Sequence, residues 1–248
     1  KMKIVMFTNT YLPHVGGVAR SVSTFTEALK KNGHSVMVVA PQTGDAQDST
    51  DDVLRVPAVQ NFNGSDFSFK LPFSGEIAKA VTDFAPDIIH SHHPFLLGDS
   101  ALRMARRLDC PVVFTHHTLY EHYVHYVPFE SESLKKLAIA LATEYANLCS
   151  AVLAPSESVR QLIIERGVVS PSFELPTGID VAAFASGDGD TCRQEYGLEP
   201  EHFVIGHLGR LAEEKNLKYL SKAVARYMKQ DRNARFLVVG GGDLEDWM

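Results

Sequence analysis

Short apolar runs alternate with amphipathic stretches over most of the chain. Lys3–Phe7 is a compact apolar run typical of a buried strand. From Val18 onward, apolar residues recur at helical spacing, and Asn32-Gly33 ends this pattern. A second apolar run, Val36–Ala40, follows at once. The opening of the chain therefore predicts a strand, a helix and a second strand, which is the β-α-β unit of α/β proteins.

The same alternation continues to about residue 178. We expect further strands at Val53–Val56, Asp87–His90, Val112–Thr115, Ala151–Ala154 and Phe173–Leu175. We expect further helices at Gly75–Phe84, Leu97–Leu108, Ser133–Cys149 and Ser156–Arg166. The strands are short and apolar throughout, as in parallel sheets covered on both faces. The predicted fold class is therefore α/β, with a doubly wound Rossmann-like domain that binds ligands near the carboxyl ends of its strands.

The composition changes after Gly178, where a stretch rich in Gly and Asp begins. This stretch, residues 179–202, reads as a loop-like crossover that follows a first domain over residues 1–178. In residues 203–248 we expect a strand at Phe203–His207, a helix at Asn216–Met228, a strand at Arg235–Val239 and then three glycines. About 45 residues are too few for a doubly wound domain. We therefore expect an incomplete second Rossmann-like domain and a truncated sequence.

Composition and charge narrow the classes of protein. The formal net charge of −6 argues against a general nucleic-acid binder, which needs a basic face. Three widely spaced cysteines form no CxxC pair and no disulfide framework, which favours a reducing compartment. Strand residues follow Met2 directly, so we expect no signal peptide and interpret Lys1 as a cloning remnant. With no apolar run long enough to span a bilayer, the sequence predicts a cytoplasmic protein.

The predicted helix Ser133–Cys149 is strongly apolar and carries Lys135 and Lys136 near its start. Such a helix either packs against a core or lies at a membrane surface, where its lysines meet anionic lipid. The sequence leaves both core packing and a peripheral membrane contact open.

Gly16 and Gly17 stand between the first predicted strand and the first helix. Glycine just before a helix removes side chains from the loop and leaves backbone N–H groups accessible, which suits a phosphate. A tight turn between strand and helix needs the same residues. From the opening alone, phosphate binding and a purely structural turn remain equally open.

Histidines gather after two of the predicted strands, in HSHHPFLLG (90–98) and FTHHTLYEHYVHY (114–126). The His90-Ser91-His92 pattern resembles one piece of a metal-dependent hydrolase site. However, the chain has no HExxH motif and no spaced Cys/His ligand set. We therefore expect no bound metal and interpret these histidines as polar lining, with His90 as a buried residue whose hydrogen bonds are satisfied.

A nucleotide-dependent oxidoreductase is also disfavoured. The first loop lacks the GxGxxG pattern. No acidic residue follows the second predicted strand to hold a ribose, because Ala40-Pro41-Gln42 occupies that place.

Two cations, Arg210 and Lys215, lie in the segment GRLAEEKN between a predicted strand and the next helix. Positive charge at a helix start is unfavourable against the helix dipole unless an anion takes it up. A diphosphate would do so, with Arg210 able to bind in bidentate fashion. The alternative is a solvated surface neutralised by Glu213 and Glu214.

Seven motifs in series resemble a known family. In order and spacing, GGVARS, HSHHPFLLG, FTHHT, APSESVR, PTGID, GRLAEEKN and VVGGGD are similar to retaining nucleotide-sugar glycosyltransferases of group 1 (family four, GT-B fold). The resemblance covers the chain from Met2 to Met248. It is closest in look to the branch that includes the diacylglycerol glucosyltransferases.

The resemblance implies two Rossmann-like domains that face a cleft and a UDP- or GDP-sugar as donor substrate, with no further cofactor. Gly16 and Gly17 would lie against the diphosphate and sugar, and His117 would contact the sugar near the reacting carbon. Arg210 and Lys215 would neutralise the leaving diphosphate in place of a metal. Further expected contacts are Gly209 and Gly240 on the donor side, and Tyr11, His93 and Tyr120 on the acceptor side.

The expected activity is transfer of a hexose, with glucose as the first candidate, to a lipid or small-molecule hydroxyl with retention of configuration. The family's E-x7-E motif would lie beyond Met248, so we expect the fragment as given to bind donor weakly. Alternatives are a nucleotide-sugar epimerase or a sugar-phosphate synthase of the same fold, or a non-catalytic fragment that binds nucleotide sugar.

Overall fold

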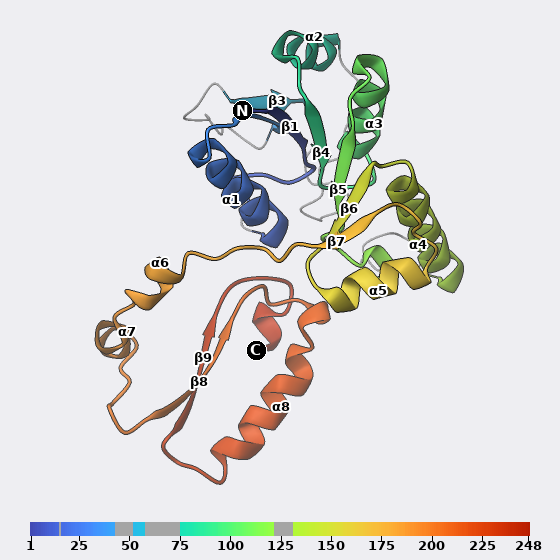
Figure 1. Ribbon diagram of the computed structural model, residues 1–248. Coiled ribbons are helices and arrows are strands. Elements are labelled where there is room, and N and C mark those ends of the chain that lie inside the picture. The colour runs from blue at the N-terminus through green and yellow to red at the C-terminus, as the bar shows by residue number, and fades with distance from the viewer. Residues whose placement is uncertain (15, 43–51, 58–74, 122–130) are drawn as a thin grey trace. The chain divides into compact units, whose positions relative to one another are not determined.

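The structure is a computed structural model that describes residues 1–14, 16–42, 52–57, 75–121 and 131–248 (Figure 1). It divides into two compact units, Lys1–Ile179 and Asp180–Met248. The division falls one residue after the end of the predicted first domain.

The first unit is built on a parallel sheet. Its described strands are β1 (Lys3–Phe7), β2 (Ser35–Pro41), β3 (Val53–Val56), β4 (Ile88–Ser91), β5 (Val112–Thr115), β6 (Ala151–Ala154) and β7 (Ser172–Glu174). They are ordered β3-β2-β1-β4-β5-β6-β7, and every neighbouring pair is parallel. The direction of strand addition reverses between β1 and β4, which makes the carboxyl ends of these two strands the switch point where open α/β sheets bind ligands.

Helices cover both faces of this sheet, as a doubly wound fold requires. They are α1 (Gly17–Lys31), α2 (Gly75–Phe84), α3 (Leu97–Leu108), α4 (Glu132–Asn147) and α5 (Glu157–Glu165). Successive side chains of β1 enter different cores, because a strand alternates its faces. Met6 packs in a cluster with Val22 of α1, whereas Phe7 belongs to the larger cluster that includes Met104 of α3 and Tyr145 of α4.

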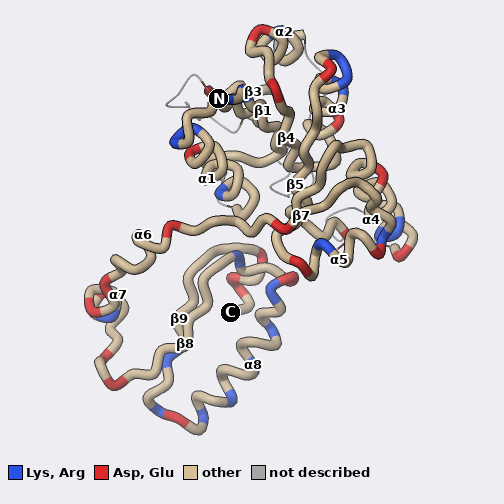
Figure 2. The backbone as a smooth tube through the Cα atoms, in the orientation of Figure 1, with Lys and Arg blue, Asp and Glu red and all other residues tan. Residues whose placement is uncertain are grey.

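The second unit holds two parallel strands, β8 (Phe203–Leu208) and β9 (Ala234–Val239), together with α8 (Leu217–Met228). Two short 3-10 turns, η3 (Glu213–Lys215) and η4 (Glu245–Trp247), follow the strands. Leu211, Leu217 and Leu244 form its buried cluster. Basic and acidic residues are interspersed along the helices of both units (Figure 2).

The prediction of a loop-like crossover at residues 179–202 is wrong in one respect. This stretch contains two short helices, α6 (Val181–Ala185) and α7 (Gly189–Glu195). The Asp residues that suggested a loop act as helix caps. The Asp180 carboxylate accepts from the Ala183 N–H at 3.0 Å, and Asp188 accepts from the Thr191 N–H at 3.1 Å. Neither helix contributes a buried residue, so apolar periodicity gave no signal for them.

Candidate functional site

Two histidines that are far apart in sequence meet at the carboxyl ends of β4 and β5. His92 directly follows β4, and His117 lies two residues beyond β5. The Nδ1 atom of His92 and the Nε2 atom of His117 are 2.8 Å apart, and the planes of the two rings are nearly parallel, at 22° to one another. His92 is fully buried, whereas His117 is half-buried. The buried ring of His92 therefore holds the ring of His117, which the resemblance predicts to contact the sugar.

His93 is fixed by Asn9, which lies two residues beyond the end of β1. The Asn9 backbone N–H donates to His93 Nδ1 at 3.1 Å. The Asn9 side-chain amide donates to the Phe95 carbonyl, and its Oδ1 accepts from the Leu97 N–H, both at 3.1 Å. These bonds tie the end of β1 to the loop after β4. His93 is itself buried, so an acceptor contact for it stays a prediction.

Tyr145 of α4 holds the rest of the HSHHPFLLG loop in place. The Tyr145 hydroxyl lies 2.7 Å from Ser91 Oγ and 2.9 Å from the Gly98 carbonyl oxygen. Ser91 Oγ donates to the His93 carbonyl at 2.9 Å. A Cβ atom at Gly98 would overlap that same carbonyl oxygen, so the close approach requires glycine. Part of this motif is therefore structural, because it shapes the loop that carries His92 and His93.

Burial keeps the histidine cluster neutral. Loss of hydration, with a smaller contribution from His117, lowers the pKa of His90 and of His93 to about 3. Burial likewise lowers the pKa of His116 and of His117 to about 4, and it lowers that of His92 well below its usual value. At neutral pH each ring therefore carries one N–H donor and one bare nitrogen.

The expectation that His90 is a satisfied buried residue is confirmed. Its Nε2 atom lies 2.7 Å from the Thr115 hydroxyl oxygen, and its ring centroid lies 4.1 Å from that of His92. Among the described residues, no group of three or more His, Cys, Asp or Glu side chains could hold a metal ion.

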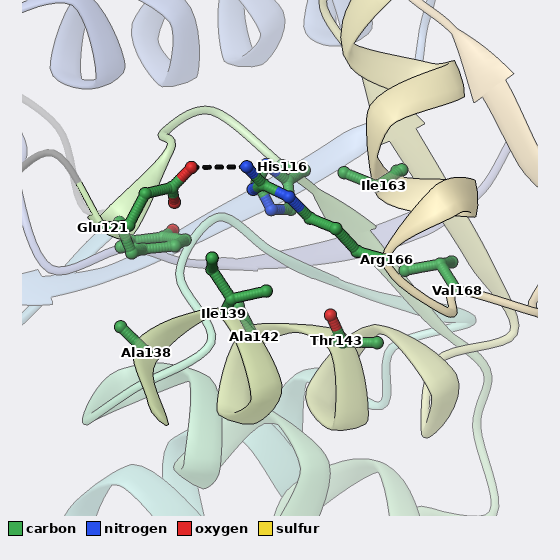
Figure 3. Close-up of a pocket in the computed structure, with 10 residues that line it drawn as sticks. His116, Glu121, Ala138, Ile139, Ala142, Thr143, Ile163, Arg166 and Val168 are labelled. Atoms are coloured by element: carbon green, nitrogen blue, oxygen red, sulfur yellow. Dashed lines mark hydrogen bonds and ion pairs between the residues drawn. The ribbon is translucent and has the colours of Figure 1, made fainter. Parts of the chain in front are cut away.

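The segment that follows β5 lines a recess together with α4 and the end of α5, and His116 is part of this lining (Figure 3). Its empty volume is about 260 Å³, which includes open solvent. Arg166 and Glu121 form an ion pair across it, at 2.6 Å. Tyr120 also lines it, and its hydroxyl is buried without a hydrogen-bond partner in the described part of the chain. The predicted acceptor role of Tyr120 stays a prediction.

Tyr11 lies in the core between the sheet and α1. It is buried in the cluster that contains Met6 and Val22. The Arg55 guanidinium stands 5.5 Å from the centre of its ring, at cation–π distance. These contacts account for the tyrosine structurally, and its predicted acceptor role stays untested.

Helix α1 begins at Gly17 with Gly16 as its N-cap, and no side chain caps it. By contrast, Ser131 caps α4 and Ser156 caps α5 through their hydroxyl oxygens. The first turn of α1 contains no acidic residue, and a Cβ atom at Gly17 would meet nothing within 4 Å. Within the described part of the chain, the first backbone N–H groups of α1 therefore have no side-chain cap, and phosphate binding at Gly16 and Gly17 stays a prediction.

In the second unit, glycines allow the loops after β8 and β9 to touch. Gly209 and Gly240 both have a φ of +150°, and a Cβ atom at Gly240 would overlap the Gly209 carbonyl. The Leu211 N–H donates to the Gly241 carbonyl at 2.9 Å. The two loops that carry the predicted donor-binding glycines are therefore in direct contact through their backbones.

Arg210 and Lys215 have different surroundings. Arg210 forms an ion pair with Glu214, whereas Glu213 pairs with Lys218. The exposed Lys215 ammonium has no ion-pair or hydrogen-bond partner in the described part of the chain. The surface alternative, in which both acids neutralise the cations, thus holds for Arg210 and not for Lys215.

His92 and the pair Glu121–Arg166 are site features that the sequence did not single out by role. In the parallel ladder Ser91 pairs with Phe114, so the residues after β4 and β5 come side by side. Knowledge of the strand order would have shown from the sequence that the two histidine motifs lie side by side.

No helix among the described residues is both long and apolar enough to cross a bilayer.

Comparison with known proteins gives matches over nearly the whole chain. The family model described as Glycosyltransferase Family 4 matches residues 15–183, and the model described as Glycosyl transferases group 1 matches residues 188–248. An alpha-monoglucosyldiacylglycerol synthase of Streptococcus pneumoniae is 30% identical over 97% of the chain and 56% of its own length. The enzyme of that name from Acholeplasma laidlawii is 28% identical over 97% and 64%. A GDP-mannose-dependent alpha-mannosyltransferase of Corynebacterium glutamicum is 26% identical over 97% and 58%. The chain thus spans a little over half the length of these relatives.

Solved structures support the fold. Anabaena HepE, in complex with UDP and glucose, superposes with a TM-score of 0.63 at 17% identity, over 96% of this chain and 70% of that one. A sucrose-phosphate synthase of Thermosynechococcus elongatus superposes with a TM-score of 0.72 at 16% identity, over 98% and 63%. The predicted α/β fold of GT-B type is confirmed.

We predict that acid destabilises the first unit through its neutral histidines. Unfolded histidine titrates near pH 6.5, whereas His90, His93, His116 and His117 titrate at about 3 to 4 when folded. Below pH 6.5 the unfolded state binds more protons, so the stability that is fully present above that pH is lost on acidification. Each histidine contributes a slope of about 1.4 kcal/mol per pH unit.

Denaturant unfolding at a series of pH values measures this slope. His93→Asn is the matched variant, because its amide oxygen can accept from the Asn9 N–H in place of Nδ1. Its slope between about pH 5.5 and 4 should be shallower by about 1.4 kcal/mol per pH unit. Identical slopes in the two proteins would contradict the assignment of His93 as a buried neutral group.

Proposed function

The chain belongs to glycosyltransferase family 4, and from this premise we propose that it acts in the transfer of a hexose from a nucleotide-diphosphate sugar to a hydroxyl acceptor, with retention at the anomeric carbon. The observation that carries the proposal is the loop after β8, where Arg210 and Lys215 follow Gly209, a glycine with a φ of +150°. Lys215 has no ion-pair partner among the described residues, whereas Arg210 pairs with Glu214.

In this proposal, the second unit binds the diphosphate. The Lys215 ammonium gives the phosphates a counter-charge that no neighbouring acid competes for in the described residues. Arg210 would exchange its bond to Glu214 for a charge-assisted bond to phosphate, which its planar fork suits. Gly209 and Gly240 let the phosphates reach backbone atoms. Fixed cations of this kind stabilise the charge that develops on a leaving diphosphate, and no metal is then needed.

The first unit contributes contacts to the sugar. The uncapped N–H groups at Gly16 and Gly17 would face the diphosphate and the sugar oxygens. His117, neutral and half-buried, would hydrogen-bond a sugar oxygen near the reacting carbon. No described side chain stands out as a covalent nucleophile. We therefore propose attack by the acceptor hydroxyl on the face that the diphosphate leaves, with a phosphate oxygen taking the hydroxyl proton.

Relatives suggest the substrates. The names of the two synthases contain a glucosyl group and diacylglycerol, and that of the mannosyltransferase contains GDP-mannose. We propose glucose as the sugar, UDP or GDP as the nucleotide, and a lipid or small-molecule hydroxyl as acceptor. We propose three acceptor contacts: His93 and Tyr120, which lie in the loops after β4 and β5, and Tyr11.

Other activities of this fold remain to be distinguished. An epimerase alters its nucleotide sugar with no acceptor present, and a sugar-phosphate synthase requires a phosphorylated acceptor. A non-catalytic fragment would bind UDP or GDP and turn over none of these. Donor scans with no acceptor, with diacylglycerol and with a sugar phosphate separate the four outcomes.

A peripheral membrane contact from the cytoplasmic side fits the surface of α4. Leu137 and Leu141 are about half exposed on this helix, and Leu148 follows them at 70% exposure. Lys136 is exposed in the first turns of the same helix. An apolar stripe with lysine beside it suits the interface of an anionic membrane. Such a contact would bring the protein to a lipid acceptor.

We predict that removing either cation of the β8 loop slows glycosyl transfer. Arg210→Ala and Lys215→Ala should each lower kcat by on the order of 10²-fold, because each removes charge stabilisation of the leaving diphosphate. The measurement is release of nucleoside diphosphate in the presence of acceptor. Lys218→Ala is the control, since Lys218 is paired with Glu213, and it should stay within about twofold of the unaltered protein. Unchanged rates in the first two variants would remove this mechanism.

We predict that the stripe on α4 mediates membrane binding. The double change Leu137→Ser and Leu141→Ser should weaken co-sedimentation with phosphatidylglycerol vesicles by about tenfold, because both side chains lose their apolar burial in the interface. Phe184→Ser, on the exposed helix α6, serves as the control and should bind as the unaltered protein does. Equal binding by all three proteins would argue against a membrane contact through α4.

A further inference from the structure

The hydrogen bond between His92 and His117 can run in two directions. If His117 donates from Nε2, then His92 accepts at Nδ1 and must carry its own proton at Nε2. If His92 donates from Nδ1, its Nε2 is bare and His117 must carry its proton at Nδ1. The direction therefore decides whether the free nitrogen of His117 is a donor or an acceptor.

Burial of His92 discriminates between the two directions. Its Nε2 atom is buried and has no hydrogen-bond partner among the described residues. A proton at this position would be a buried N–H with no acceptor, which native proteins rarely contain. A bare nitrogen at the same position is an acceptor without a donor, which they tolerate somewhat more often. The packing around His92 thus favours the proton at Nδ1.

We propose that His92 is a positioning residue: it donates its Nδ1–H to His117 Nε2, and so holds His117 in the tautomer that presents Nδ1–H as a hydrogen-bond donor. The ligand of that donor is an oxygen of the transferred sugar. This part deepens the proposed function and rests on it, whereas the tautomer rests on the geometry alone.

The consequence for chemistry is specific. A His117 with its proton at Nδ1 and its other nitrogen engaged by His92 has no free lone pair with which to deprotonate an acceptor hydroxyl. It can donate a hydrogen bond to a sugar oxygen and so hold the nucleotide sugar in place, but it cannot act as a general base. The 2.8 Å hydrogen bond between the two rings, whose planes are nearly parallel, restricts rotation of the His117 imidazole, so its Nδ1–H stays aimed in one direction.

The tautomer can be read directly by nitrogen-15 NMR of the histidine rings in the 248-residue chain at neutral pH. The His117 signals are assigned by their loss in His117→Asn. We expect a protonated, pyrrole-type Nδ1 and a bare, pyridine-type Nε2 for His117. The reverse pattern, or fast averaging of the two tautomers, would overturn the proposal whether or not the protein transfers sugar.

Two substitutions of His92 test the positioning role. His92→Asn can keep an N–H near the place of Nδ1, whereas His92→Leu keeps bulk and removes the donor. We expect His117 to retain its single tautomer in His92→Asn and to lose it in His92→Leu. Transfer in the leucine variant should show a kcat/KM lower by about tenfold, in line with the loss of one oriented hydrogen bond, and the asparagine variant should recover most of it.

Thermal unfolding of both variants separates positioning from folding. If His92→Leu does not fold, the ring signals of the unaltered chain and of His92→Asn still decide the tautomer. A leucine variant that folds and keeps both the His117 tautomer and the transfer rate would contradict the proposal. Absence of transfer in the unaltered protein would count against the proposed function alone, since the tautomer is measured without substrate.

Discussion

Parallel pairing of β4 with both β1 and β5 is the constraint on which the first unit depends. The ladder continues past the strands, since the His92 N–H donates to the Phe7 carbonyl at 2.9 Å. This pairing therefore determines where Asn9, His92 and His117 lie relative to one another at the carboxyl ends of the strands. A slip of one residue in this register would turn each side chain to the opposite face. The hydrogen bonds from Asn9 to the β4 loop and the contact between His92 and His117 both require the observed register.

Burial then determines what these groups can do. A histidine in water would share its proton between two nitrogens and would charge near neutral pH, but the cluster at the ends of β4 and β5 stays neutral. Fixed neutral rings suit the hydroxyl groups of a sugar, and exposed cations suit phosphates. In the proposed function the two units would divide these tasks: His117 belongs to the first, and Lys215 belongs to the second, where the neighbouring acids are engaged by Arg210 and Lys218.

The strands could be predicted from the sequence because their apolar runs are short and bounded by turn residues; β1, β3 and β5 match the expected ranges at both ends. Helices α6 and α7 could not be predicted in this way, because they have capping residues but no buried apolar face. Candidate residues next to glycine motifs were found from local pattern alone. The partnership of His92 with His117 needed strand order and register, and the choice of Glu214 for Arg210 needed side-chain geometry, neither of which periodicity contains.

Recognition of the diphosphate by charge, in the loop after β8, is the step on which the proposed function depends. Titration of nitrogen-15 labelled protein with UDP, and in parallel with uridine, tests it most directly. We expect UDP to shift the backbone amides of Gly209 through Asn216, with Lys215 among them, and uridine to leave this loop unchanged. Equal shifts from both ligands, or shifts from UDP that bypass this loop, would contradict it.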